Sequence, residues 1–131
     1  MTISIRHDPY PVMPPYEDIY AFGVETRAQA RILNISGQVG VSPEGELPSD
    51  FAGQCRQALH NVEAILKKAD MKLSDIVKTT FYLTRREDMP ALIEVRKEIL
   101  GGVRPANTTL FISGLVSPDW FVEVDIIACA K

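Results

Sequence analysis

Apolar and polar residues alternate along several short segments of this chain, and this pattern constrains its fold more than any other feature. The segment 76–84 is the most regular example. One set of its side chains is apolar or β-branched (Val77, Thr79, Phe81, Leu83), and the other set is more polar (Lys78, Thr80, Tyr82, Thr84). Because successive residues of a strand point to opposite faces, this alternation predicts a strand with one buried face. Further strands are expected at 18–25, 31–41, 107–113 and 121–129.

The alternation also assigns individual side chains to faces. In 31–41, we expect Leu33, Ile35 and Val39 on the apolar face and Asn34, Ser36 and Gln38 on the polar face. In 121–129, Val122, Val124, Ile126 and Ala128 form the apolar face, and Glu123 and Asp125 lie together on the other. The polar face of the resulting sheet either meets solvent or contacts other copies of the protein.

Two amphipathic helices are predicted between the strands. The first covers 50–69, where apolar residues recur every three or four positions and Ser49 or Asp50 can cap the start. The second starts at Asp88 or at the Met89-Pro90 step and ends at the glycines 101–102. Two such helices suffice to cover one face of a sheet, so the predicted fold class is α+β.

Length and composition favour a single domain over residues 1–131, with the proline-rich stretch 1–15 as an irregular N-terminal arm. The net charge of −3 gives no reason to expect nucleic acid binding. No apolar stretch approaches the ~20 residues that span a bilayer, and the start of the chain lacks a signal-peptide layout. The two cysteines form no CxxC motif. We therefore expect a cytoplasmic protein without a metal or cofactor.

Several short motifs occur in a fixed order along the chain. They are Tyr-Ala-Phe-Gly-Val at 20–24, Ser-Gly-Gln-Val at 36–39, Asp-Ile-Val-Lys-Thr-Thr at 75–80, Pro-Ala-Asn-Thr at 105–108 and Val-Glu-Val-Asp-Ile-Ile-Ala at 122–128. In this order they resemble the RidA/YjgF family of reactive-intermediate (imine/enamine) deaminases. The resemblance implies a chorismate-mutase-like fold, with a mostly antiparallel sheet and two helices packed on one face. It also implies a homotrimeric barrel with clefts between subunits, where 2-imino acids are hydrolysed to 2-keto acids and ammonia without a cofactor.

The resemblance further implies roles for individual residues. Glu123 matches the carboxylate that positions or activates water, which makes it the candidate catalytic residue. Asn107 stands where these deaminases carry an arginine that binds the substrate carboxylate, and Thr109 where some members carry a cysteine. Ser36 completes the candidate substrate-binding set, with a hydrogen bond to backbone or to another subunit as the alternative reading.

Other positions leave alternatives open. The pocket tyrosine of the family matches Tyr20, with Tyr16 as the competing alignment. Ile93 replaces a pocket asparagine. Loss of a charged hydrogen-bonding partner weakens carboxylate binding by roughly 10–150-fold, so Asn107 is a serious departure. Arg104 is a candidate substitute for the missing arginine, and Asn107→Arg is expected to raise activity on 2-imino acids.

Three functions compete at this stage. The first is a divergent deaminase or hydrolase of imines, enamines or related small molecules, with Glu123 handling water. The second is a trimer that binds or senses a small molecule and has lost the chemistry together with the arginine. The third is a protein-interaction role, which no particular residue favours.

Overall fold

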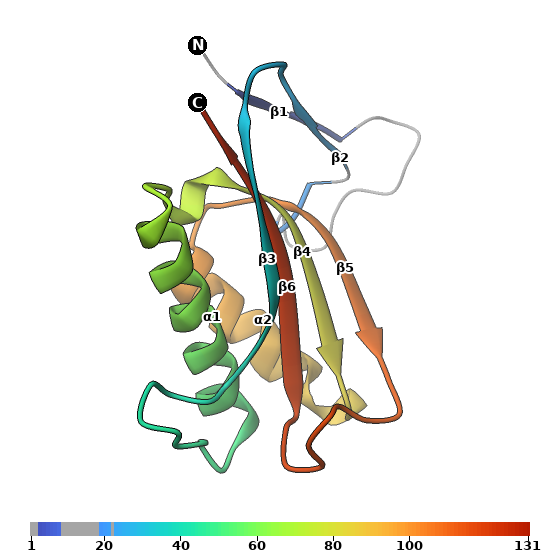
Figure 1. The fold of residues 1–131 in the computed structure, drawn as a ribbon. Coiled ribbons are helices and arrows are strands. Elements are labelled where there is room, and N and C mark those ends of the chain that lie inside the picture. Colours follow the sequence, from blue (N-terminus) through green and yellow to red (C-terminus); the bar gives the residue numbers. More distant parts are fainter. Residues whose placement is uncertain (1–2, 9–18, 22) are drawn as a thin grey trace.

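The computed structural model describes residues 3–8, 19–21 and 23–131, and these build the layered α+β arrangement of Figure 1. The strands are β1 (Ser4–His7), β2 (Gly23–Thr26), β3 (Arg31–Val39), β4 (Ile76–Leu83), β5 (Ala106–Phe111) and β6 (Val122–Ala130). The helices are α1 (Phe51–Lys68) and α2 (Met89–Leu100), with short 3-10 turns at η2 (Leu73–Asp75) and η3 (Arg86–Asp88). Predicted and observed element bounds agree closely from 31 onward.

The main sheet has the strand order β3-β6-β4-β5. β6 pairs antiparallel with both β3 and β4, whereas β5 runs parallel to β4. The parallel pair arises because the chain returns from β4 to β5 through α2, a crossover that two-residue hairpins cannot provide. Both helices lie on one face of this sheet, and the other face is not covered by a helix (Figure 1). The expected helix-covered, mostly antiparallel sheet is therefore confirmed.

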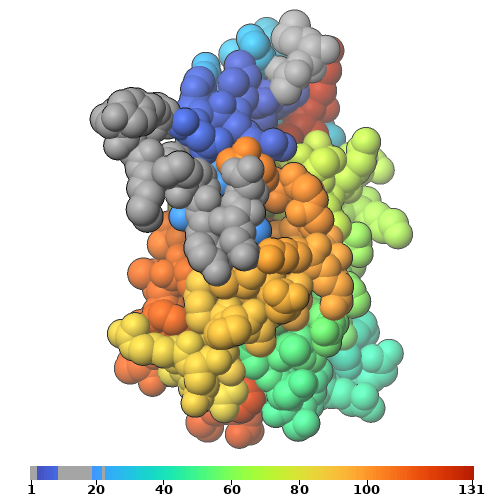
Figure 2. Space-filling view, turned by 180° about the vertical axis from the view of Figure 1, so that it is seen from behind, coloured from blue at the N-terminus to red at the C-terminus, as the bar shows by residue number. Residues whose placement is uncertain are grey.

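The interior lies between the helices and the apolar faces of β4 and β6. Phe81, Leu59, Leu66, Leu92 and Ile126 are among the fully buried side chains. Asp50 caps α1, since its carboxylate accepts a hydrogen bond from the Gly53 amide at 3.1 Å. Seen from behind, α1 (green) and α2 (yellow to orange) form much of the lower surface, with β1 and β2 above them (Figure 2). No helix of the described residues is long and apolar enough to cross a membrane.

The N-terminal stretch differs from the expectation of an irregular arm over 1–15. Residues 4–7 form β1, which pairs antiparallel with β2 in a separate two-stranded sheet. The segment is too short to show a periodic pattern, so the sequence did not predict a strand there. The strand forms because it pairs with a partner some twenty residues away. Of the strand expected at 18–25, the described part is strand only from Gly23, and Ala21 makes an isolated bridge to Ala106.

A β-bulge in β3 corrects the predicted faces of that strand. The register shifts between Ile35 and Gln38, where β3 carries one residue more than β6. Beyond the bulge, Gln38 lies opposite the buried Val124 and Val39 lies opposite Glu123. Because an inserted residue reverses the side-chain alternation, Gln38 and Val39 exchange the faces that strict alternation predicts.

Candidate functional site

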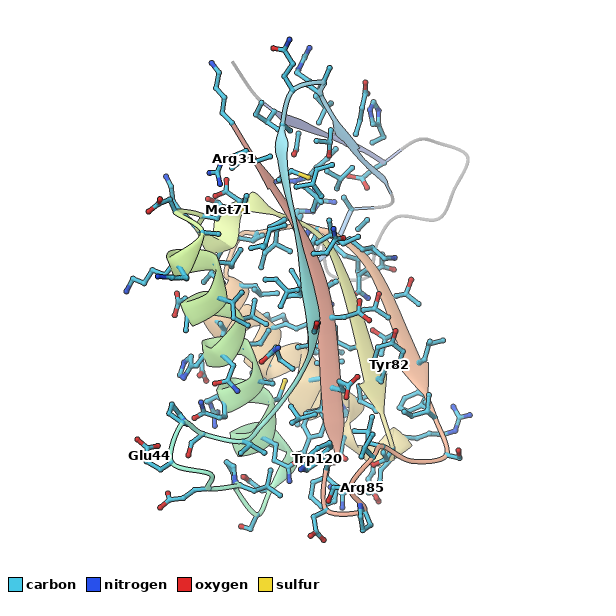
Figure 3. All side chains as sticks on the ribbon, viewed as in Figure 1. Arg31, Glu44, Met71, Tyr82, Arg85 and Trp120 are labelled. Carbon is cyan, nitrogen blue, oxygen red and sulfur yellow. The ribbon has the colours of Figure 1, made fainter. Side chains whose placement is uncertain are left out.

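The residues that the sequence grouped into one site lie on opposite faces of the main sheet. Asn107 of β5 is in register with Thr79 of β4, which is buried on the helix-covered face. Glu123 of β6 is in register with Tyr82, on the open face. Figure 3 labels Tyr82 on the sheet, away from α1. Asn107 and Glu123 therefore do not share a face of the sheet within one chain, because parallel pairing puts Asn107 beside Thr79.

A cavity of about 280 Å³ opens on the helix-covered side, between α2 and β5. We call it the α2–β5 cavity. Its lining is Ile19, Tyr20, Met89, Leu92, Ile93, Arg96, Asn107 and Thr109. The structure thus brings together three of the four predicted substrate-binding residues, Tyr20, Asn107 and Thr109. The competing Tyr16 lies outside the described residues.

Asn107 is held in place by its neighbours. Its side-chain oxygen accepts hydrogen bonds from the Thr79 hydroxyl and from Nη1 of Arg96, both at 2.7 Å. Its Nδ2 donates to the Thr109 hydroxyl at 3.1 Å. The oxygen of this amide is therefore already engaged on two sides, and its clearest role is to fix the position of the Arg96 guanidinium.

Arg96 is the site residue that sequence reasoning missed. It lies on α2 among apolar neighbours and is only 3% exposed. Nη2 donates to the carbonyl oxygen of Ile19 at 2.9 Å, and the guanidinium lies over the Phe81 ring at 5.1 Å from its centroid. Burial lowers the pKa of Arg96 to about 10, so the side chain keeps its charge at neutral pH. The available signal was its place on the helix stripe, one turn after Leu92.

The open face carries the other half of the predicted site. Gly37 passes so close to Glu123 that a Cβ built on Gly37 would overlap the Glu123 carboxylate. The neighbouring Ser36 is exposed at the bulge, and its carbonyl oxygen accepts a hydrogen bond from Gln38 Nε2 at 3.1 Å. The bulge therefore brings Gly37 against Glu123, and neither Ser36 nor Gly37 is among the described residues that line the α2–β5 cavity.

Asp125 has a structural partner on the same face. Its carboxylate accepts a hydrogen bond from the Tyr82 hydroxyl at 2.9 Å, and this bond raises the pKa of Tyr82. No side chain of the described residues makes a hydrogen bond or ion pair with Glu123. Of the two carboxylates, only that of Asp125 is therefore engaged by another side chain in this part of the chain.

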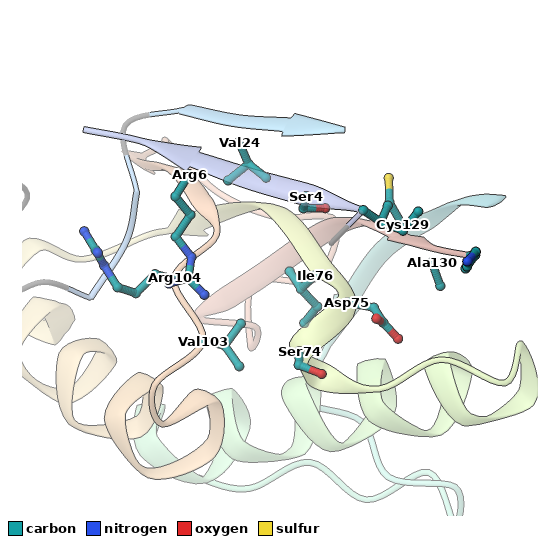
Figure 4. A pocket seen from close by; sticks show the side chains of 12 residues that line it. Ser4, Arg6, Val24, Ser74, Asp75, Ile76, Val103, Arg104, Cys129 and Ala130 are labelled. Atoms are coloured by element: carbon teal, nitrogen blue, oxygen red, sulfur yellow. The ribbon is translucent and has the colours of Figure 1, made fainter. Parts of the chain in front are cut away.

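Arg104 does not reach the α2–β5 cavity. It forms an ion pair with Asp8 at 2.9 Å and donates to the carbonyl oxygen of Tyr20 at 3.1 Å. Its side chain lines a different cavity of about 580 Å³, between the two-stranded sheet and the ends of β4 and β6 (Figure 4). Arg104 thus ties the N-terminal strands to the segment before β5.

Both cysteines are buried, and neither lines the α2–β5 cavity. Cys55 is fully buried, and burial raises the pKa of its thiol to about 12. Cys129, near the end of the chain, is 5% exposed. Within the described part of the chain, no three His, Cys, Asp or Glu side chains cluster in a way that could hold a metal ion.

Comparison with known proteins agrees with this fold and these motifs. The family model described as Endoribonuclease L-PSP matches residues 18–130. A 2-iminobutanoate/2-iminopropanoate deaminase of Escherichia coli K12 is 39% identical over 134 residues, covering 99% of this chain and 98% of the relative. A RutC family protein of Pyrococcus horikoshii is 34% identical over 128 residues, covering 96% and 94%.

Solved structures show the same fold. A Rid family protein from Yersinia pestis, YyfB, superposes with a TM-score of 0.86 at 24% identity, covering 98% of this chain and all of that one. TdcF of Escherichia coli with bound serine superposes with a TM-score of 0.73 at 29% identity, covering 95% and 94%. With its motifs, its fold and a family match over nearly the whole chain, this protein belongs to the RidA/YjgF family, which the Endoribonuclease L-PSP model describes.

Proposed function

We propose that this protein is a cofactor-independent hydrolase of small imines or enamines, whose site forms between neighbouring subunits of a homotrimer. The observation that carries this proposal is the separation of the candidate residues. Asn107 and Thr109 line a cavity on the helix-covered side, and Glu123 lies on the open face. One chain cannot bring these groups to a single small substrate, whereas two chains can.

The position of β5 supports such an arrangement. It is an outer strand of the main sheet, and beyond the isolated bridge between Ala106 and Ala21 its outer edge is unpaired among the described residues. Leu110 on this strand is 44% exposed and is in register with Tyr82 of the open face. Exposed apolar residues beside an unpaired edge favour contact with another chain. The open face of a neighbouring subunit would then supply Glu123 to the rim of the α2–β5 cavity.

The proposed reaction is addition of water to the C=N carbon. Glu123 accepts a proton from the attacking water as the new C–O bond forms and the C=N π bond breaks. The substrate nitrogen takes up one proton from solvent as the C=N π bond breaks, and Glu123 returns the proton of the water to the same nitrogen. The C–N bond then breaks and ammonia leaves, while the hydroxyl group loses its proton to solvent and the C=O bond forms. The net change is imine plus water to carbonyl compound plus ammonia, which requires neither a redox partner nor a metal. The name of the Escherichia coli relative supports this substrate class.

The experiment compares Glu123→Gln with a control on the same face. Freshly generated 2-iminobutanoate is the substrate, and formation of ammonia and 2-oxobutanoate is followed above the uncatalysed rate. Loss of a general base is expected to lower the rate by about 10²–10⁴-fold in Glu123→Gln. Asp125→Asn keeps an acceptor for Tyr82 and should retain most activity. Equal rates for wild type and Glu123→Gln would remove Glu123 from the mechanism.

The second candidate function is a small-molecule binder without turnover. It is favoured by one observation, namely that Asn107 has replaced the arginine of the deaminases and uses its polar atoms on Thr79, Arg96 and Thr109. A ligand that binds tightly to the trimer, together with no ammonia release from a broad imine panel, would favour this function. Turnover of any imine that depends on Glu123 would rule it out.

A further inference from the structure

The guanidinium of Arg96 is buried, and the part of the chain that the structure describes supplies no negative charge to compensate it. No ion pair joins Arg96 to a carboxylate of the described residues, and the acceptors it has are an amide oxygen and a backbone carbonyl. An arginine has five N–H donors, and these two hydrogen bonds use two of them. Its Nε is buried and has no acceptor among the described residues. Burying a cation in this way costs free energy unless an anion or further acceptors offset it.

The location of this cation gives it access to a ligand. Arg96 is part of the lining of the α2–β5 cavity, and most of the remaining lining is apolar, with Met89, Leu92 and Ile93 on the same helix. Apolar walls keep the local dielectric low, which strengthens the attraction between the guanidinium and an anion in the cavity. A cavity of about 280 Å³ suits a small molecule rather than a polymer.

The acceptors on Arg96 hold it without neutralising it. Asn107 accepts from Nη1 and Ile19 from Nη2, so the plane of the guanidinium is fixed on two sides. Both acceptors are neutral, so the full positive charge remains. A cation that is fixed in advance loses little further conformational freedom when a ligand binds. An aspartate at 107 could make the same contact but would cancel the charge.

We propose that Arg96 is the residue that binds the carboxylate of an anionic ligand in the α2–β5 cavity, with Asn107 as its positioning residue. The guanidinium that the resemblance expects on β5 is thus supplied from α2 instead. The inference extends the proposed function by assigning substrates with a carboxylate to the same site, and it restores an anion-binding group that position 107 lacks.

The test measures binding of two matched probes to the intact oligomer by isothermal titration calorimetry. The probes are 2-oxobutanoate, which carries a carboxylate, and its neutral amide, 2-oxobutanamide. Wild type should bind the carboxylate more tightly than the amide. Arg96→Met should weaken 2-oxobutanoate binding by roughly 10–150-fold, the range for loss of a charged hydrogen-bonding partner, and leave the amide nearly unaffected. Arg96→Lys should lose less, since it keeps the charge but not the planar fork.

Asn107→Asp is the second variant and separates charge from shape. It is nearly isosteric and retains an oxygen for Arg96 Nη1 and Thr79, so folding should survive. Its carboxylate neutralises Arg96 internally, and 2-oxobutanoate binding should fall at least as far as in Arg96→Met. Unchanged binding of 2-oxobutanoate in this folded variant would overturn the proposal.

Three further outcomes are decisive. Equal weakening of both probes in Arg96→Met, or no preference for the carboxylate in wild type, would overturn the proposal. Dissociation of the oligomer in Arg96→Met would also overturn it, because the counter-charge would then belong to another subunit. Glu123→Gln tests the proposed function separately, since it should lower turnover by about 10²–10⁴-fold while leaving Arg96-dependent binding intact. If wild type shows Arg96-dependent binding but no turnover, the anion site is supported and the hydrolase function is refuted. If wild type turns over neutral imines alone, the hydrolase function is supported and the anion site is refuted.

Discussion

Gly37→Ala tests whether the close contact between the β3 bulge and Glu123 sets the position of the carboxylate. A Cβ on Gly37 would lie 2.7 Å from Glu123 Cδ and 3.0 Å from Cγ, and it would overlap Oε2. Ordinary carbon contacts are about 3.5–4.0 Å, so the carboxylate must move by about 1 Å. The backbone can accept alanine, because Gly37 is not among the glycines with positive φ.

The structural cost of this change is small. The atoms that must give way are the free end of a flexible side chain, and an off-rotamer torsion costs about 0.5–1.5 kcal/mol. Replacing glycine lowers the entropy of the unfolded chain and returns about 0.4–1 kcal/mol. The two terms nearly cancel, so the melting temperature should stay within about 5 °C of wild type. Catalysis is more sensitive, because a misplacement of about 1 Å can cost about 10²-fold in rate.

The assay is hydrolysis of freshly generated 2-iminobutanoate in a double-mutant cycle with Glu123→Gln. Gly37→Ala should lower the rate by about 10²-fold in wild type and add little in Glu123→Gln, because its effect passes through the carboxylate. Gly102→Ala, where an added Cβ meets nothing within 4 Å, is the matched control and should be silent. An equal loss in both backgrounds, or none in wild type, would refute the reasoning.

Four other predictions follow from packing and charge. Gln54→Leu should destabilise the fold by about 2 kcal/mol or more, measured by denaturant unfolding. The Gln54 side chain is 1% exposed and forms hydrogen bonds with two backbone carbonyls and one backbone amide, and all three groups would lose this partner. Burial raises the pKa of Cys55 to about 12 from 9.0, so the thiol of the unfolded chain ionises at a lower pH than that of the folded chain. The free energy of unfolding should therefore fall above pH 9, by up to about 1.4 kcal/mol per pH unit, and Cys55→Ala should lack this contribution to the slope. Light scattering should give wild type a mass of about three times the chain mass of 14.6 kDa. Leu110→Glu should give a smaller species, because it puts a charge on the exposed edge strand, and a wild-type monomer would contradict the proposed assembly. Asn107→Arg alone should lower the melting temperature, because it places a second cation against Arg96, whereas adding Arg96→Met should restore stability. This reverses the gain of activity that the resemblance predicts for Asn107→Arg, and such a gain in the single variant would contradict the role proposed for Arg96.

Local patterns predicted most of the secondary structure. The alternation at 76–84 predicts β4 because that strand is buried on one face only, and the helix stripe with Asp50 before it predicts α1 to within a residue at each end. The pattern could not predict β1, since Ser4–His7 gains its structure from pairing with β2. It also failed at Gln38 and Val39, because a bulge is set by how two strands fit together.

The residues of the candidate site were likewise predicted only in part. Tyr20, Asn107 and Thr109 were assigned to one pocket by resemblance, and they line one cavity. Arg96 was not assigned, since an arginine on a helix stripe looks the same in sequence whether its guanidinium reaches solvent or a cavity. Its role depends on Asn107, which is eleven residues away in the chain and 2.7 Å away in space.

The sequence by itself determined both helices and the strands of the main sheet, which family the chain resembles, and that Asn107 stands where this resemblance expects an arginine. These properties depend on residue type and short spacing, both of which are local. The tertiary structure alone decided that Asn107 and Glu123 lie on opposite faces of the sheet, because that depends on the parallel pairing of β5 with β4. It also decided that a cation from α2 lies against Asn107, because helix packing on the sheet brings distant residues together.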